Sequence, residues 1–116
     1  MIQIKRIYEP AEKRDGWRVL VDRLWPRGMK KDEAQVDVWM KEIAPSDELR
    51  KWFGHDLARW PEFQKRYRAD LTQKKLMLAD LKKMEKQHGK LTLLFGAKDA
   101  GHNQAVILAE ALKKQK

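Results

Sequence analysis

The stretch Leu91-Thr92-Leu93-Leu94-Phe95 is a short, mostly apolar run bounded by Gly89 and Gly96. Its length and composition are typical of a β-strand that is buried on both faces, as the strands of parallel sheets are. An amphipathic pattern follows from Asn103 to Lys114 and predicts a helix. A strand followed by a helix is the unit of α/β folds, so this part of the chain indicates a sheet that is at least partly parallel.

Earlier segments predict the rest of the sheet. Residues 2–8 and 17–24 have strand patterns, and the alternation over residues 36–43 predicts a third early strand that ends before Pro45. The tetrapeptide Trp25-Pro26-Arg27-Gly28 has Pro and Gly at the places that a type I turn favours. We therefore expect a single α/β domain over residues 1–116, a layered sandwich whose small, at least partly parallel sheet is flanked by helices.

Helices are expected between these strands. Residues 30–34 predict one helical turn, and Ser46 is a candidate N-cap for a helix over residues 47–54 that ends at Gly54. Residues 62–87 have a helical pattern that Gly89 stops. One continuous helix of this length would reach about 40 Å, which is long for so small a domain, so we expect a bend or break near Thr72-Gln73.

Composition excludes several classes of function. The 116 residues include 26 Lys and Arg, 17 Asp and Glu, five Trp and no Cys, and the net charge is +9. Without Cys there is no disulfide, iron–sulfur cluster or thiol nucleophile. The three His lack metal-ligand spacing, so no metal or other cofactor is expected. No apolar run approaches the ~18 residues of a membrane span, and no secretory signal is recognisable, which predicts a cytoplasmic protein without membrane contact.

Most of the polar side chains that could bind a ligand follow the expected strands, in residues 22–28, 44–50 and 96–103. The carboxyl ends of parallel strands meet at one edge of a sheet, where ligands gather. We predict a pocket there for a small anion that carries phosphate or carboxylate, because guanidinium and ammonium groups bind both. The candidate binding residues are Arg23, Arg27, Ser46, Arg50, Lys98 and Asn103. The candidate proton-transfer residues, if the site catalyses a reaction, are Asp22, His55, Asp99 and His102.

Structural roles explain the same residues without a ligand. Asp22 and a neighbouring Arg can form an ion pair, and Asp99 or Asn103 can cap the last helix. Ser46 is accounted for by helix capping, and His55 by packing among aromatic side chains.

Two other functions fit the composition. One is binding of nucleic acid or an acidic partner through the basic face of the helix over residues 62–87, which carries Lys65, Arg68, Lys75, Lys82, Lys83 and Lys86. The other is a protein–protein surface formed by exposed Trp side chains, which would set an oligomeric state that the sequence leaves open.

The run Val21-Asp22-Arg23-Leu24-Trp25-Pro26-Arg27-Gly28, together with Ala44-Pro45-Ser46, resembles the bacterial YeaO-like family, a branch of domain-of-unknown-function family 488 (DUF488). The resemblance extends from Ile4 to Leu112. Longer relatives of the wider family carry Cys-Ala-Glu after the last strand and Cys-His-Arg at the following helix. The matching stretches here read Phe95-Gly96-Ala97-Lys98 and His102-Asn103-Gln104, so the resemblance implies the polar cluster but no thiol chemistry.

Overall fold

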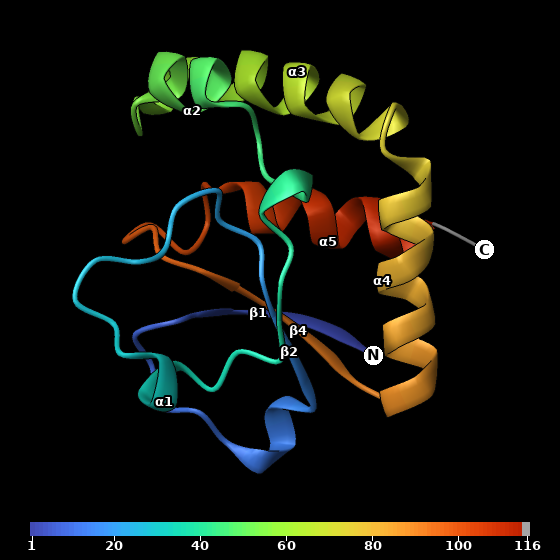
Figure 1. Ribbon diagram of the computed structural model, residues 1–116. Coiled ribbons are helices and arrows are strands. Elements are labelled where there is room, and N and C mark those ends of the chain that lie inside the picture. Colours follow the sequence, from blue (N-terminus) through green and yellow to red (C-terminus); the bar gives the residue numbers. More distant parts are fainter. Residues whose placement is uncertain (115–116) are drawn as a thin grey trace.

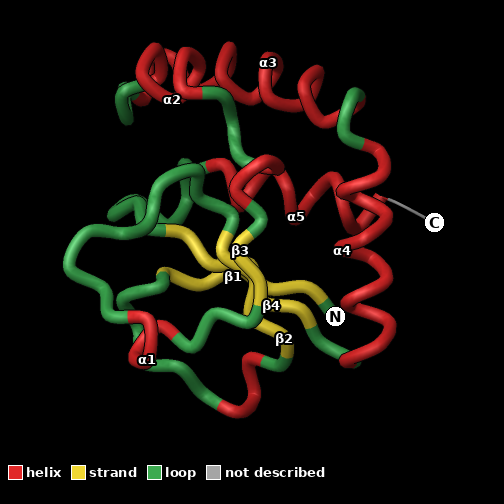
Figure 2. Tube along the Cα trace, in the orientation of Figure 1, coloured by secondary structure: helices red, strands yellow, loops and turns green. Residues whose placement is uncertain are grey.

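A computed structural model describes residues 1–114 and contains a four-stranded, all-parallel sheet. The strand order is β1-β4-β2-β3, with β1 at Ile2–Arg6, β2 at Trp17–Leu20, β3 at Val38–Trp39 and β4 at Leu91–Phe95. The α/β sandwich with a parallel sheet is thereby confirmed. Figure 2 shows the long loops at the edge of this sheet away from the N-terminus.

The strand that comes last in the sequence is central in the sheet. Leu93 of β4 is paired with Ile4 on one side and with Val19 on the other. All five residues of β4 are buried, as its apolar run predicts. The loops that follow β1, β2 and β4 consequently begin side by side.

Within residues 1–114, five α-helices flank the sheet (Figure 1). They are α1 at Lys31–Ala34, α2 at Asp47–Phe53, α3 at Trp60–Thr72, α4 at Lys75–His88 and α5 at Gln104–Lys114; short 3-10 helices span Lys13–Asp15, Lys41–Ile43 and Leu57–Arg59. The predicted break near Thr72-Gln73 is confirmed, and Figure 1 shows α4 turning sharply away from α3. Ser46 caps α2 by accepting a hydrogen bond from the Leu49 N–H at 3.1 Å.

Different sets of side chains pack on the two faces of the sheet. On one face, side chains of α2 to α5, among them Tyr67, Leu81 and Leu108, pack with Val19 and Leu93 in the main hydrophobic core. The smaller cluster on the other face joins Leu20 and Leu94 to Ile7 and Ala34, and includes the single turn of α1. The helices next to the loops at the carboxyl ends of the strands thus lie on one side of the sheet.

Three local predictions are wrong in detail. Of residues 36–43 only Val38–Trp39 are a strand, because the chain turns into a 3-10 helix at Lys41. The first two strands end at Arg6 and Leu20, before the predicted Tyr8 and Leu24. The turn is one residue later than expected: the Met29 N–H donates to the Pro26 carbonyl at 3.3 Å, and Gly28 takes the third place with a φ of 76°. Such a positive φ favours Gly because it lacks a Cβ.

Candidate functional site

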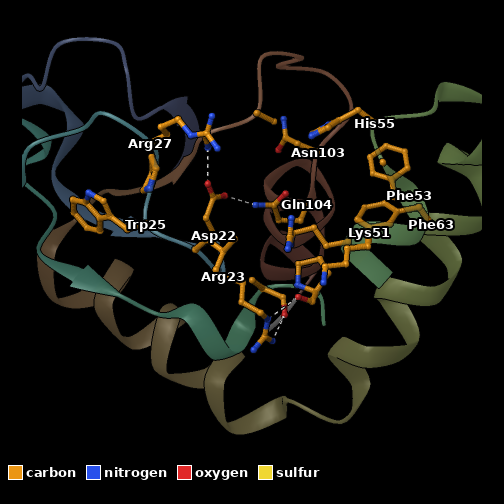
Figure 3. Close-up of a pocket in the computed structure, with 18 of the residues that line it drawn as sticks. Asp22, Arg23, Trp25, Arg27, Lys51, Phe53, His55, Phe63, Asn103 and Gln104 are labelled. Atoms are coloured by element: carbon orange, nitrogen blue, oxygen red, sulfur yellow. Dashed lines mark hydrogen bonds between the residues drawn. The ribbon is translucent and has the colours of Figure 1, made fainter. Parts of the chain in front are cut away.

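A pocket of about 550 Å³ lies at the carboxyl ends of β1, β2 and β4 (Figure 3). One part of its lining is residues 22–27, which follow β2, and another is Gly96 and Ala97, which follow β4. The second half of α2 and the start of α5 complete it. The pocket is therefore at the edge of the sheet where the strand order predicts ligand binding.

The structure brings together part of the predicted site. Asp22, Arg23, Arg27, Arg50, His55 and Asn103 line the pocket. Four other candidates, Ser46, Lys98, Asp99 and His102, are not among its lining residues. Residues as far apart in sequence as Asp22 and Asn103 thus meet in one cavity, because β4 is next to β2 in the sheet.

Asp22 connects three elements at the pocket. Its Oδ2 accepts a hydrogen bond from the Gly96 N–H at 2.8 Å, and its Oδ1 accepts one from Gln104 Nε2 at 2.6 Å. Burial raises the pKa of the Asp22 carboxyl, against the opposing effects of these two hydrogen bonds and of electrostatic interactions with Arg50 and His55. The carboxylate does not form an ion pair with any described residue, in contrast to the ion pair with a neighbouring Arg considered above.

The pocket also holds cations with spare binding capacity. Arg27 and Lys51 are exposed, and their side chains make no hydrogen bond or ion pair with residues 1–114. Arg50 has one weak partner, Asp47, at 3.4 Å on the surface. These three side chains are free to contact a ligand.

The Arg23 side chain, unlike the three cations just described, is held by backbone carbonyl groups. Its Nε donates to the Pro45 carbonyl at 2.9 Å and its Nη2 to the Ala44 carbonyl at 3.0 Å. Lys74 Nζ donates to the same Ala44 carbonyl at 3.2 Å, and burial lowers the pKa of Lys74. The Arg23 side chain therefore holds the segment before α2 in place, and contributes positive charge to the pocket rather than a free guanidinium.

His55 is at the rim of the pocket in an unusual backbone conformation. Its φ is 60°, and the preceding Gly54 has a φ of 52°, so two consecutive residues are left-handed. For a residue with a Cβ this conformation costs about 1–2 kcal/mol. The imidazole lies 5.9 Å from the ring of Phe53, which with Phe63, Trp25 and Pro26 gives the pocket an apolar wall.

The last loop has its own local bonding. Asn103 caps α5, since its Oδ1 accepts from the Ala105 N–H at 2.9 Å, which is the structural role considered above. Asp99 Oδ2 and His102 Nδ1 are 2.9 Å apart on the surface, and this hydrogen bond lowers the pKa of Asp99. Lys98 is exposed beside them. This Asp–His pair is outside the pocket lining.

The basic face is divided between two helices. Lys65 and Arg68 are on α3, and the remaining four cations are on α4 beyond the break. Arg68 binds Glu110 at 3.1 Å and Lys82 binds Glu85 at 2.9 Å, so part of this charge is neutralised within the fold.

None of the five Trp side chains is fully buried. Trp17, Trp25, Trp52 and Trp60 are half-buried, and Trp39 is 38% exposed.

Within residues 1–114 no group of three or more His, Asp or Glu is arranged to hold a metal ion. None of the helices described has the length and apolar character to cross a membrane.

Sequence reasoning missed three features of the pocket. Lys51 follows Arg50 on α2, and Gln104 follows Asn103 at the start of α5, so both were adjacent to residues already selected. Spacing along a helix could have indicated Lys51, but the contact of Gln104 with Asp22 depends on tertiary packing. The apolar wall includes Phe53 and Phe63, which also belong to the main hydrophobic core.

Known proteins match this chain along nearly its full length. The family model described as the inactive DUF488-N3 subclade matches residues 1–116. The uncharacterized protein YeaO of Escherichia coli (strain K12) is 47% identical over 115 residues, which are 97% of this chain and 96% of that protein. The uncharacterized protein Rv3073c of Mycobacterium tuberculosis (strain ATCC 25618 / H37Rv) is 38% identical over 111 residues, which cover 96% of this chain and 92% of that protein. No solved structure matches the chain.

Proposed function

This chain belongs to the DUF488 family, in the subclade described as inactive, and on that premise we propose that it binds a small phosphate- or carboxylate-bearing ligand without transforming it. The subclade is described as inactive, which supports binding over catalysis. The absence of Cys from the chain agrees, since it leaves the site without a thiol nucleophile. A binding function needs no proton transfer from Asp22, His55, Asp99 or His102.

One observation carries this proposal: unpaired cations line a pocket at the carboxyl ends of parallel strands. Arg27 and Lys51 have no partner among the described residues, and Arg50 is held only by a surface contact with Asp47. An anion in the pocket would give these side chains a partner, and guanidinium groups can bind phosphate or carboxylate with two hydrogen bonds. The N-terminus of α5 at the pocket adds positive potential.

Binding of nucleic acid through the basic face is supported less. The face predicted on one helix is split at Thr72, and two of its cations already have carboxylate partners. A polyanion held by the net charge of +9 would bind with an affinity that falls steeply with salt. The affinity of the pocket for a small anion would fall much less as the salt concentration rises.

The test is a thermal-shift panel of orthophosphate, phosphorylated sugars, nucleotides, dicarboxylates and short DNA and RNA, at two salt concentrations. A ligand at 100 times its dissociation constant stabilises the protein by about 2.7 kcal/mol, and should raise the Tm by about 4 °C or more. We expect at least one small anion to do so at both salt concentrations.

The double variant Arg27→Ala/Lys51→Ala should bind that anion at least tenfold more weakly. The control Arg14→Ala/Lys83→Ala removes the same charge from exposed positions outside the pocket and should bind normally. Equal loss in both double variants, or a response to polymers alone, would overturn the proposal.

A further inference from the structure

The cations of the pocket surround a carboxylate that has no cation of its own. Asp22 is the one acidic side chain among the described residues that line the pocket. In Figure 3, Asp22 and Gln104 lie in the middle of the pocket, with Arg27 to one side and Lys51 to the other. A ligand that carried only negative charge would be attracted by the rim and repelled by this central carboxylate.

Hydrogen bonds inside the protein use only part of the carboxylate. Oδ2 accepts from Gly96 and Oδ1 from Gln104, one bond each. An ionised carboxylate offers about four acceptor positions, so each oxygen keeps one. Burial raises the pKa of Asp22, against the lowering effect of these hydrogen bonds. A donor with positive charge would supply what is missing.

We propose that the ligand is a small zwitterion, whose protonated amine binds the Asp22 carboxylate while its phosphate or carboxylate binds the cations on one side of it, Arg27 or the pair Arg50 and Lys51. This inference rests on the proposed anion-binding function and adds the second half of the recognition. It assigns a partner to the central carboxylate as well as to cations at the rim. The apolar wall of Phe53, Phe63 and Trp25 would contact the carbon chain between the two charges.

The experiment compares ligands that differ only by an amine or a hydroxyl at one position. One pair is O-phosphoethanolamine and 2-hydroxyethyl phosphate; the other is glutamate and 2-hydroxyglutarate. Each is titrated into the ¹⁵N-labelled full chain at pH ~7 and constant ionic strength, and the backbone amide of Gly96, which donates to Asp22, reports the binding. The two pairs distinguish a phosphate from a carboxylate as the anionic group.

The two binding models predict opposite preferences. If the pocket recognises negative charge alone, the hydroxyl compounds should bind more tightly, because each carries more net negative charge. If Asp22 binds the amine, the amine compound of at least one pair should bind ten times more tightly or better. Asp22→Asn should reduce this preference below threefold, because it removes the negative charge that attracts the amine. If the Gln104 amide turns over, its Oε1 can accept a hydrogen bond from the new Asn amide, in exchange for the 3.3 Å hydrogen bond from Gln104 Nε2 to the Val21 carbonyl.

Asp47→Asn is the matched control. It removes a carboxylate next to Arg50 that does not line the pocket, and should preserve the amine preference. Equal or reversed affinities in the unmodified chain overturn the zwitterion and leave the anion pocket standing. Failure of all four compounds to shift the Gly96 amide, together with a silent thermal-shift panel, overturns both proposals. A preference that survives Asp22→Asn overturns the assigned role of Asp22.

Discussion

The carboxylate Oδ2 of Asp22 and the backbone nitrogen of Gly96 are 2.8 Å apart, which ties the loop after β2 to the loop after β4. The same oxygen would lie 2.8 Å from a Cβ placed on Gly96, and Pro26 would be 3.7 Å from it. The close approach of these two loops therefore requires Gly at position 96, and it shapes the floor of the pocket.

Gly96→Ala should destabilise the protein by about 1–3 kcal/mol, because the added methyl group displaces the Asp22 carboxylate from its hydrogen bond. Urea unfolding measures this loss, and a ligand titration should show weaker binding as well. The control is Gly101→Ala, where the nearest atom to the new Cβ would be Asp99 Oδ1 at 3.6 Å, an ordinary contact. That variant should remain within about 0.5 kcal/mol of the unmodified chain. Equal stabilities of the two variants would contradict the steric argument.

His55→Gly should be more stable than His55→Ala by about 0.5–1 kcal/mol. Both variants lose the imidazole and its contact with Phe53, but only Gly relieves the left-handed φ of 60°. The gain is partial because Gly has more freedom to lose on folding. Chemical unfolding measures the difference. If the imidazole contacts the ligand, both variants should bind it equally weakly, so stability and affinity would respond to different properties of the same residue.

Acidification should act in opposite directions through two carboxylates, the buried Asp15 and the partly buried Asp22. Burial of Asp15 alone would raise its pKa, but hydrogen bonds from the Glu12 N–H, Lys5 and Arg18 outweigh burial and lower it. Its stabilising contribution is therefore complete above the unfolded-state pKa of about 3.9 and is lost as the pH falls through the folded-state pKa. Asp22 has a raised pKa, so its folded form takes up a proton first, and its contribution becomes more favourable as the pH falls.

Unfolding free energies measured from pH ~7 to pH ~3 should separate these effects. Asp15→Asn should lose less stability on acidification than the unmodified chain, and Asp22→Asn should lose more. The Asp15 variant starts from a lower value at neutral pH, by about 3–5 kcal/mol, because Arg18 is left as a buried charge without its partner. Parallel pH profiles for the two variants would contradict the assignment of the pKa directions.

Tyr67→Phe should destabilise the protein by about 1–3 kcal/mol. The Tyr67 hydroxyl donates to the Ile43 carbonyl at 2.8 Å in a fully buried position, and Phe would leave that carbonyl unsatisfied. The matched control is Tyr8→Phe, which removes a hydrogen bond of the same length to the Arg27 carbonyl at an exposed position. Its effect should be below about 0.5 kcal/mol, since water replaces the lost donor. Similar losses in differential scanning calorimetry would refute the dependence on burial.

Local patterns predicted a large part of this fold. The apolar run of β4, the Ser46 cap, the Gly54 stop and the break after Thr72 each depend on residues within a few positions of one another. The prediction of a strand over residues 36–43 was wrong because the alternation continues through Lys41–Ile43, which form a 3-10 helix. There the buried hydrogen bond from Tyr67 to Ile43 holds the chain, and that partner is 24 residues away.

Apart from residues 36–43, local sequence patterns were enough to locate the strands and helices and the polar residues that follow the strands, because periodicity, capping and turn chemistry act over short range. Which of these polar residues meet depends on the tertiary fold. With β4 next to β2, Gly96 and Gln104 reach Asp22, whereas Lys98, Asp99 and His102 are carried past the pocket. Arg23 and Arg27 are four positions apart, yet one donates to the carbonyls of residues 44 and 45 and the other has no partner among residues 1–114. The direction of a long charged side chain depends on the acceptors that distant segments bring to it, and local sequence does not encode those.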